Sequence, residues 1–390
     1  MARKDDKWTS KFTHLECSSC GKTYKPGVIN SCTCGKPLLA RYDAEGLQQS
    51  DLLARKDLWR YAPLLPVSRP ENAVTLGEGG TPLIRAEKLP GILGVKEVFV
   101  KDEGGNPTGT FKARGMAVAV SKAKELGLRK LAVATTGSAG SGLAAYAREA
   151  GITAFIAFAK GTSPFHVRTS KSYGAEVVLC EGYIPDAIAV VQRLCDQEGY
   201  FDIATMHEPY RVEGKKTITY EIAEQLGDLP DAIVFPVGGG TGIVSGWKAW
   251  LEMKEMGWAE NDPRLYFVQS QGCAPVYTAW REGKDSCDMW PEVRTKAPGL
   301  AIPKPFADEL ILRSVKETKG GGVAVSDEDM IASMKEFWEQ ESISACIEGA
   351  ATLAGAKELV KQGLIKSDDR VVLLNTGVGR TRIPKPASPP

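Results

Sequence analysis

The chain has 390 residues, and its 49 basic and 48 acidic side chains leave a formal net charge of +1. This length is enough for two lobes with separate cores, and the near-neutral charge, with no basic stripe among aromatic residues, argues against nucleic-acid binding. No apolar run reaches membrane-spanning length, and the charged first seven residues lack the apolar stretch of a signal peptide. The sequence therefore predicts a cytoplasmic protein that makes no contact with a membrane.

Two close pairs of cysteines form the first motif along the chain. Cys17 and Cys20 have CxxC spacing, and Cys32 and Cys34 have the tighter CxC spacing. Four thiolates can close a tetrahedral zinc site, and the metal would replace the core that so small a module lacks. The pattern predicts either a zinc ribbon or a ribbon that has lost its metal. The remaining cysteines are interpreted as small buried or half-buried apolar residues: Cys180, Cys195, Cys273, Cys287 and Cys346.

After a loop at residues 77–82, apolar strands alternate with helical segments. Runs of β-branched residues without polar alternation, spaced by helices, indicate parallel sheets covered on both faces, so the predicted fold class is α/β. The expected strands are 97–101, 131–134, 153–158, 176–179, 232–237, 265–268 and 370–374. The expected helices between them include 143–150, 167–173, 185–198 and 243–256. The proline-rich residues 384–390 are expected to be disordered.

A lysine begins one predicted helix. Residues 106–110 are typical of a turn, and residues 111–126 show helical spacing with a stop at Gly127. Lys112 thus falls in the first helical turn, where the helix dipole disfavours the ammonium form and lowers the pKa of the amine. A lysine that forms a Schiff base needs this setting. The alternative is a solvated surface lysine.

A glycine-rich loop follows the predicted strand 232–237, and it consists of Gly238, Gly239, Gly240, Thr241 and Gly242. Glycines let consecutive backbone N–H groups converge on an anion, with the N-terminus of the next helix behind them. The loop lacks the Lys-Ser/Thr ending of a Walker A motif and fits no GxGxxG register. It therefore predicts a site for a monophosphate, the alternative being a flexible turn.

Two weaker signals stand at other strand ends. The small-residue segment 135–142, which contains Thr135, Thr136 and Ser138, is predicted to be a turn that could hold a carboxylate in the same way. Thr376 follows the last predicted strand, where its hydroxyl can face a ligand. Capping of the strand ends would explain either segment.

Together these segments resemble the fold-type II pyridoxal phosphate (PLP) enzymes, and within them the threonine synthase group. The resemblance runs from about Gly77 to Thr376. Four motifs carry it: GTPL at 80–83, KDEGGNPTGTFKARG at 101–115, EPYRVEGKKT at 208–217 and PVGGGTG at 236–242. The cysteine-ribbon leader also looks like members of this group.

The resemblance implies a two-lobed, tryptophan synthase β-like fold with parallel-rich sheets and a small zinc-ribbon-like module in front. The implied divisions are an N-terminal segment 1–55, a large PLP-binding lobe of 56–115 and 210–383, a small lobe 116–209, and the tail 384–390. A homodimer is expected by the same analogy.

The resemblance also implies roles for the cofactor residues. Lys112 would form the Schiff base with PLP and later move protons at the substrate carbons. Residues 238–242 would hold the cofactor phosphate, and Ser138 would stand beside the cofactor's ring hydroxyl. Thr376 matches the family hydroxyl that faces the pyridine nitrogen, and a hydroxyl does not force that nitrogen to be protonated.

The substrate implied by the resemblance is O-phospho-L-homoserine, a small phosphorylated amino acid. Arg211 matches the arginine that binds its phosphate, because a planar guanidinium can donate two hydrogen bonds at once. The alternative is a surface ion pair of Arg211 with Glu208 or Glu213. Thr135 and Thr136 would bind the rest of the substrate.

The chain departs from the family pattern at three positions. Ser138 stands where the family places an asparagine, Thr205 replaces an upstream asparagine, and Thr135 replaces a serine. Three hypotheses follow. The first is threonine synthase, with L-threonine and phosphate as products. The second is β-elimination or β-replacement, as in a serine/threonine dehydratase or a sulfur-amino-acid synthase. The third is a PLP-binding or zinc-ribbon interaction protein without turnover.

Overall fold

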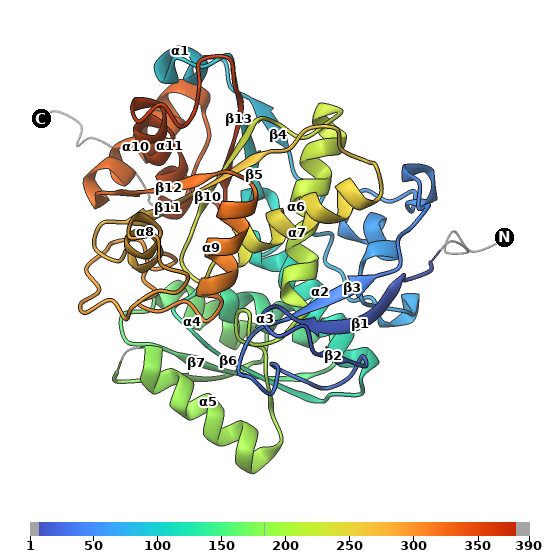
Figure 1. The fold of residues 1–390 in the computed structure, drawn as a ribbon. Helices are drawn as coiled ribbons and strands as arrows, with labels where there is room; N and C mark the ends of the chain where they lie inside the picture. Colours follow the sequence, from blue (N-terminus) through green and yellow to red (C-terminus); the bar gives the residue numbers. More distant parts are fainter. Residues whose placement is uncertain (1–7, 183, 380–390) are drawn as a thin grey trace, which may run out of the picture.

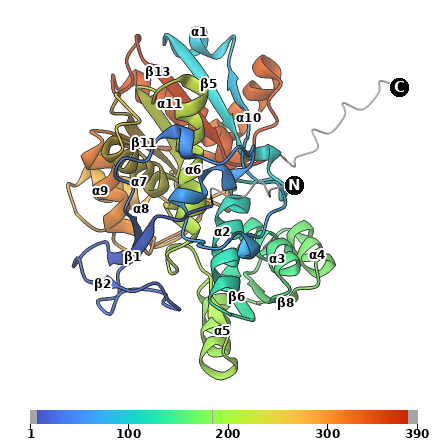
Figure 2. The ribbon, with the colours of Figure 1, turned by 90° about the vertical axis from the view of Figure 1, so that its right-hand side faces the viewer.

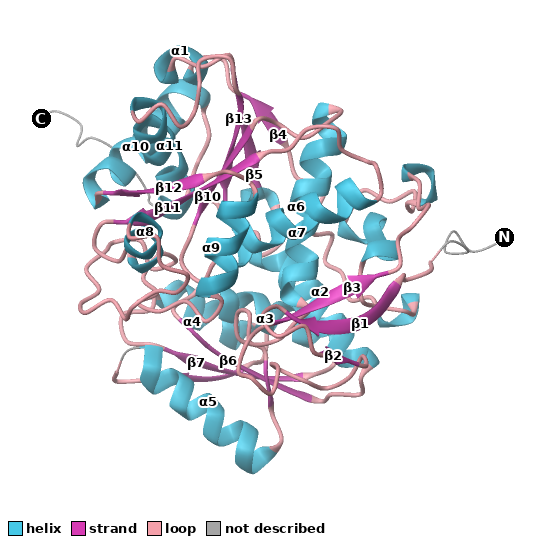
Figure 3. Cartoon of the chain, viewed as in Figure 1, coloured by secondary structure: helices cyan, strands magenta, loops and turns pink. Residues whose placement is uncertain are grey.

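The computed structural model describes residues 8–182 and 184–379, so the tail 384–390 lies outside the described residues. Three sheets and the helices on their faces make up the fold (Figures 1 and 3). Within the described part of the chain, no helix is long and apolar enough to cross a membrane.

The largest sheet has six strands in the order β12-β11-β10-β13-β5-β4. Its strands are β4 (Leu83–Arg85), β5 (Glu97–Asp102), β10 (Ala232–Pro236), β11 (Arg264–Ser270), β12 (Gly321–Val325) and β13 (Arg370–Asn375). All neighbouring strands run parallel except β4, which pairs antiparallel with β5. The predicted parallel α/β architecture is therefore confirmed.

Helices cover both faces of this sheet because its strands are apolar on both sides. Along β10, Ile233 and Phe235 enter one core cluster, whereas Ala232 and Val234 enter another. The first cluster contains residues of α6 (Arg211–Leu226), α7 (Thr241–Glu255), α8 (Pro275–Arg281) and α9 (Asp308–Glu317). The second contains residues of α1 (Leu89–Leu93), α10 (Asp327–Glu341) and α11 (Ile347–Lys361). Figure 1 shows α6 and α7 on one side and α10 and α11 on the other.

The second sheet has four parallel strands in the order β8-β7-β6-β9. They are β6 (Lys130–Thr135), β7 (Thr153–Phe158), β8 (Glu176–Leu179) and β9 (Phe201–Asp202). The helices of this part are α2 (Lys112–Glu125), α3 (Ser138–Ala150), α4 (Pro164–Ser172) and α5 (Ile184–Glu198). α5 packs on one face of the sheet, while α2 and α3 pack on the other (Figure 2).

The N-terminal module contains a small antiparallel sheet in the order β2-β1-β3. Its strands are β1 (Phe12–Cys17), β2 (Thr23–Tyr24) and β3 (Leu38–Tyr42). Short 3-10 helices follow at η1 (Gln49–Asp51), η2 (Leu58–Leu64), η3 (Pro70–Asn72) and η4 (Glu103–Gly105). Leu15 and Leu38 share a core cluster with Trp59 and with α2, so the module is packed onto the rest of the protein.

The strands expected from the sequence are confirmed to within about two residues, but the small-residue segment 135–142 is only partly a turn. α3 begins at Ser138, so Gly140 and Gly142 lie inside a helix. A Cβ on Gly140 would lie 2.7 Å from the Phe158 ring, which shows that these small residues let α3 approach β7 closely. The implied lobe boundaries stay a prediction.

Candidate active site

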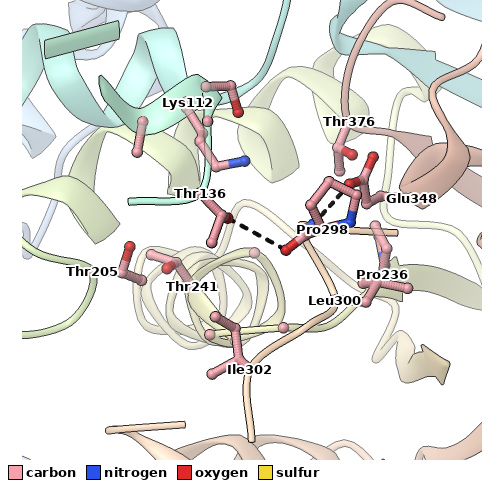
Figure 4. Close-up of a pocket in the computed structure, with 18 of the residues that line it drawn as sticks. Lys112, Thr136, Thr205, Pro236, Thr241, Pro298, Leu300, Ile302, Glu348 and Thr376 are labelled. Atoms are coloured by element: carbon pink, nitrogen blue, oxygen red, sulfur yellow. Dashed lines mark hydrogen bonds between the residues drawn. The ribbon is translucent and has the colours of Figure 1, made fainter. Parts of the chain in front are cut away.

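Residues that follow the carboxyl ends of strands in both larger sheets line one cavity of about 2000 Å³. β10 ends at Pro236, β13 at Asn375 and β6 at Thr135. In open parallel sheets, ligands bind outside the carboxyl ends of the strands, because the loops there converge. This cavity is therefore the candidate active site (Figure 4).

The structure brings together every residue that the sequence assigned to cofactor or substrate. These cavity-lining residues are Lys112, Thr135, Thr136, Ser138, Arg211, Gly238, Gly239, Gly240, Thr241, Gly242 and Thr376. Thr205, at a position where the chain departs from the family pattern, lines the cavity too. The four N-terminal cysteines form a separate group in the N-terminal module.

Lys112 is the first residue of α2, as the sequence predicted. Figure 4 shows its amine directed toward the side of the cavity that carries Thr376 and Glu348. Burial is the main cause that lowers the pKa of Lys112 below its usual value, and the charge of Arg211 adds to the effect. The charge of Glu348 acts in the opposite direction. The expected direction of the pKa shift is right, but burial rather than the helix dipole is the leading cause.

The glycine loop has the geometry of an anion cradle. α7 begins at Thr241, and its N-cap residue Gly240 has φ 78° and no side-chain capping bond. The first N–H groups of the helix are thus left for a ligand. A Cβ on Gly238 would lie 2.1 Å from the Gly299 carbonyl oxygen, and one on Gly240 would lie 2.1 Å from Ile311. Side chains are excluded here, and the backbone fits a phosphate group.

Thr376 stands at the end of β13 and is 6% exposed. Its Oγ1 lies 3.5 Å from Cys346 Sγ. Burial raises the pKa of the Cys346 thiol to about 12, so this thiol is neutral. The preceding residue, Asn375, donates a 2.8 Å hydrogen bond to Asp102 and joins the ends of β13 and β5. Thr376 and Cys346 are therefore uncharged polar groups at a fixed strand end, and the carboxylate of Glu348 lies on the same side of the cavity (Figure 4).

Arg211 begins α6 and is 1% exposed. Its Nη1 donates to the Ile203 carbonyl oxygen at 2.9 Å, whereas Nε and Nη2 have no hydrogen-bond partner in the structure. The alternative of a surface ion pair is wrong because Arg211 is buried. Glu208 instead accepts the backbone N–H groups of Tyr210 and Arg211, each at 2.8 Å. A buried cation with free donors at a cavity wall is suited to binding an anion.

A segment without regular structure, residues 296–306, closes one side of the cavity. Pro298 accepts a 3.5 Å hydrogen bond from Thr136, and the Gly299 N–H donates to Glu348 at 2.8 Å (Figure 4). Sequence reasoning missed this segment because it has no periodicity. It also missed the cavity-lining Lys215, although the EPYRVEGKKT motif contains it.

Comparison with known proteins identifies the class. The chain belongs to the pyridoxal-phosphate dependent enzymes, whose family profile matches residues 74–377. More particularly, it belongs to the threonine synthase family. It is 37% identical over 372 residues to threonine synthase of Methanosarcina acetivorans, covering 93% of this chain and 91% of the relative. Threonine synthase of Methanocaldococcus jannaschii is 34% identical over 371 residues, with the same coverage.

Solved structures show the same fold at lower sequence identity. Maize serine racemase superposes with a TM-score of 0.69 at 21% identity, covering 77% of this chain and 89% of its own. Threonine deaminase isoform 2 of Solanum lycopersicum gives a TM-score of 0.65 at 23% identity, covering 83% and 90%. The fold-type II architecture expected from the motifs is confirmed.

Proposed function

We propose that this protein catalyses the PLP-dependent conversion of O-phospho-L-homoserine and water into L-threonine and phosphate. Membership of the threonine synthase family supports the reaction. One observation supports O-phospho-L-homoserine as the substrate. Arg211 is a buried guanidinium with two unpartnered nitrogens, and it lines the same cavity as Lys112. An anionic group of a ligand would both accept hydrogen bonds from those donors and offset the charge of the guanidinium.

The residues of the cavity fit PLP. Lys112 is the residue for covalent attachment, and its lowered pKa favours the neutral, nucleophilic amine. The loop 238–242 would hold the phosphate through backbone N–H groups, because a side chain at Gly238 or Gly240 would clash with its neighbours. Thr376 and Ser138 line the same cavity. By the family resemblance, Thr376 would offer an uncharged hydroxyl to the pyridine nitrogen, and Ser138 would offer a hydroxyl to the ring hydroxyl group.

When bound, the cofactor draws electrons from the substrate carbons, which makes protons at Cα and then Cβ easier to remove. Lys112 takes the proton from Cα, a proton from Cβ follows, and Arg211 holds the phosphate that leaves from Cγ. Water then adds its hydroxyl at Cβ, and Cγ and Cα take up protons to give threonine. Thr135 and Thr136 bind the substrate carboxylate. The segment 296–306 covers the reacting atoms and restricts the access of bulk water.

The test of this function is product analysis with PLP-loaded protein. O-phosphohomoserine should yield threonine and phosphate in equal amounts, and Arg211→Met should abolish phosphate release. Arg193→Lys, on the exposed surface of α5, is the matched control and should leave the rate unchanged. No phosphate release by the wild type, or 2-oxobutyrate from threonine and pyruvate from serine, would contradict the proposal and favour a β-eliminating enzyme.

A second experiment tests the attachment residue. Borohydride reduction of the PLP-loaded protein, followed by peptide mapping, should place the pyridoxyl label on Lys112. Lys215 is a natural internal control, because it is also buried and lines the same cavity. A label on Lys215, or on no lysine, contradicts the assignment of Lys112.

We also propose that Cys17, Cys20, Cys32 and Cys34 hold one structural zinc ion. Their sulfur atoms all lie within 4.8 Å of one another, with 3.5 Å from Cys17 to Cys34 and 3.6 Å from Cys20 to Cys32. Zinc–thiolate bonds of 2.3 Å in a tetrahedron give sulfur separations of about 3.8 Å, so the group fits the metal. The backbone N–H of Cys20 is 3.5 Å from Cys17 Sγ, and that of Cys34 is 3.5 Å from Cys32 Sγ, as expected for thiolate acceptors.

The proposal extends to a homodimer in the cytoplasm. Support for the location comes from the cysteines, because all nine lie in the described residues without forming a disulfide, which is typical of a reducing compartment. Support for the dimer comes from the family resemblance. Light scattering measures the assembly directly, and a monomer in solution contradicts it.

A further inference from the structure

A second buried cation stands beside Arg211. Arg211 and Lys215 lie four residues apart on α6, so they share a face of the helix. Both line the cavity, and Lys215 is only 2% exposed. Lys215 Nζ lies 4.3 Å from the centre of the Phe111 ring, and Lys112 Nζ lies 5.2 Å from the same ring. Three basic side chains therefore gather at one part of the cavity wall.

Lys215 differs from the other fully buried lysines because it has no carboxylate partner. The next residue, Lys216, pairs with Glu213 at 2.7 Å and with Glu252 at 2.9 Å. Ion pairs with glutamates are also made by Lys101, Lys122 and Lys248. Across residues 8–182 and 184–379, Lys215 makes neither an ion pair nor a side-chain hydrogen bond.

An unpaired ammonium group in this position is costly to bury. Burial is the main cause that lowers the pKa of Lys215 well below its usual value, and the charges of Arg211 and Lys112 lower it further. Nε and Nη2 of Arg211 also lack partners. Glu208 offsets part of the charge of both side chains, and Asp202 part of that of Arg211. The two nitrogens of Arg211 still lack an acceptor among the described residues, and an anion would bind both side chains together.

We propose that Lys215 and Arg211 jointly bind the phosphate of a phosphate monoester, with Lys215 supplying the second cation of the site. The inference rests on the proposed function and deepens it, because both the substrate and the cofactor carry such a group. The guanidinium provides two fixed donors, and the amine provides a compact charge on a flexible stem. The cofactor is one source of this phosphate group. Lys215 lies over the Phe111 ring, and that ring is 3.6 Å from the position of a Cβ on Gly242, in the loop proposed for the cofactor phosphate. The substrate is the other source, because Arg211 is proposed to bind the substrate phosphate.

The test compares wild-type protein with Lys215→Gln and Lys215→Met in two titrations. Inorganic phosphate is added to the PLP-loaded enzyme, PLP is added to the cofactor-free enzyme, and both are followed by calorimetry. Loss of one charge-assisted contact corresponds to a rise in Kd of roughly 10- to 100-fold. A rise in the Kd for inorganic phosphate, together with a similar rise in the KM for O-phosphohomoserine, assigns Lys215 to the substrate phosphate. A rise for PLP alone assigns it to the cofactor phosphate.

Proton uptake and folding stability separate binding from a structural role. Calorimetry in two buffers of different ionisation enthalpy should show proton uptake when the phosphate binds, and Lys215→Gln should abolish it. Lys215→Met removes an unpaired buried amine and should fold with an unchanged or higher melting temperature. The matched control Lys216→Gln removes a paired lysine outside the cavity, so it should lower the melting temperature and leave both Kd values unchanged.

Two unchanged Kd values in folded Lys215 variants would overturn the inference. Both titrations measure binding without turnover, so they also separate the two proposals. If phosphate and PLP binding depend on Lys215 but no threonine forms, the phosphate site stands and the proposed reaction falls. If threonine forms and neither Kd depends on Lys215, the reaction stands and the phosphate site falls.

Discussion

Arg114 and Glu221 are joined by two parallel hydrogen bonds in the interior, Nη1 to Oε1 at 2.5 Å and Nη2 to Oε2 at 2.8 Å. Arg114 also binds Glu103, and Glu221 also accepts from Lys101 at 2.8 Å. This network connects α2, α6 and β5. Because Arg114 is two residues beyond Lys112, the network fixes the first turn of α2 at the active site.

Glu221→Gln should lower the free energy of unfolding by about 3–5 kcal/mol, because it leaves two buried cations without their shared carboxylate. Urea denaturation measures the change. Glu224→Gln, on the same helix, alters the partly exposed pair with Arg60 and should cost at most about 1 kcal/mol. Equal effects of the two substitutions would show that the buried network contributes no more than a surface pair.

We expect the carboxylate of Glu221 to make the stability of the protein depend on pH. Burial alone would raise the pKa of Glu221, but Arg114 and Lys101 outweigh burial and lower it from 4.5 to about 2. A folded-state pKa below the unfolded value means that the stabilisation is complete above pH 4.5 and is lost as the pH falls to about 2. The free energy of unfolding, measured stepwise through this window, should fall more steeply for the wild type than for Glu221→Gln.

Gly238→Ala should weaken PLP binding by roughly tenfold or more, because the new Cβ would lie 2.1 Å from the Gly299 carbonyl and the loop would have to shift. Fluorescence titration of the cofactor-free protein measures the Kd. Gly91→Ala is the control, since a Cβ on Gly91 meets nothing within 4 Å. An unchanged Kd for Gly238→Ala would contradict the assignment of this loop to the cofactor phosphate.

Metal analysis of purified protein should find one zinc ion per chain, and Cys20→Ser should reduce that content and lower the melting temperature. A chelator should have the same effect on the wild type, because structural zinc contributes directly to folding. Cys195→Ser changes a half-buried cysteine outside the module and should keep the zinc. Metal-free protein that melts at the same temperature with and without added zinc would refute the metal site.

The sequence was sufficient for the parallel strands except β9 and β12, and for the motif residues of the cavity, because these are local signals. β12 escaped detection because it begins with Gly321 and Gly322, which are poor strand formers. In the structure, a Cβ on Gly322 would lie 2.0 Å from the Phe267 ring. The glycine that hid the strand is therefore needed for its packing against β11.

The sequence does not predict every residue of the cavity wall, because the role of several residues depends on contacts with residues that are distant in the sequence. The sequence places Lys215 next to Lys216 in one motif. Only the structure shows that Lys216 pairs with Glu213, whereas Lys215 has no ion pair within the part of the chain that is described. Glu348 likewise shows no spacing signal. It is part of the site because its carboxylate accepts a hydrogen bond from the Gly299 N–H at 2.8 Å.

The position of β13 between β10 and β5 has a consequence for biosynthesis. β13 is translated after every other strand of its sheet, so a nascent chain exposes two unpaired parallel edges until residues 370–375 leave the ribosome. Thr376 emerges immediately afterwards. A polypeptide that stops before β13 would therefore be an aggregation-prone fragment rather than a partly active one, and the cofactor site is complete only after Thr376 has been translated.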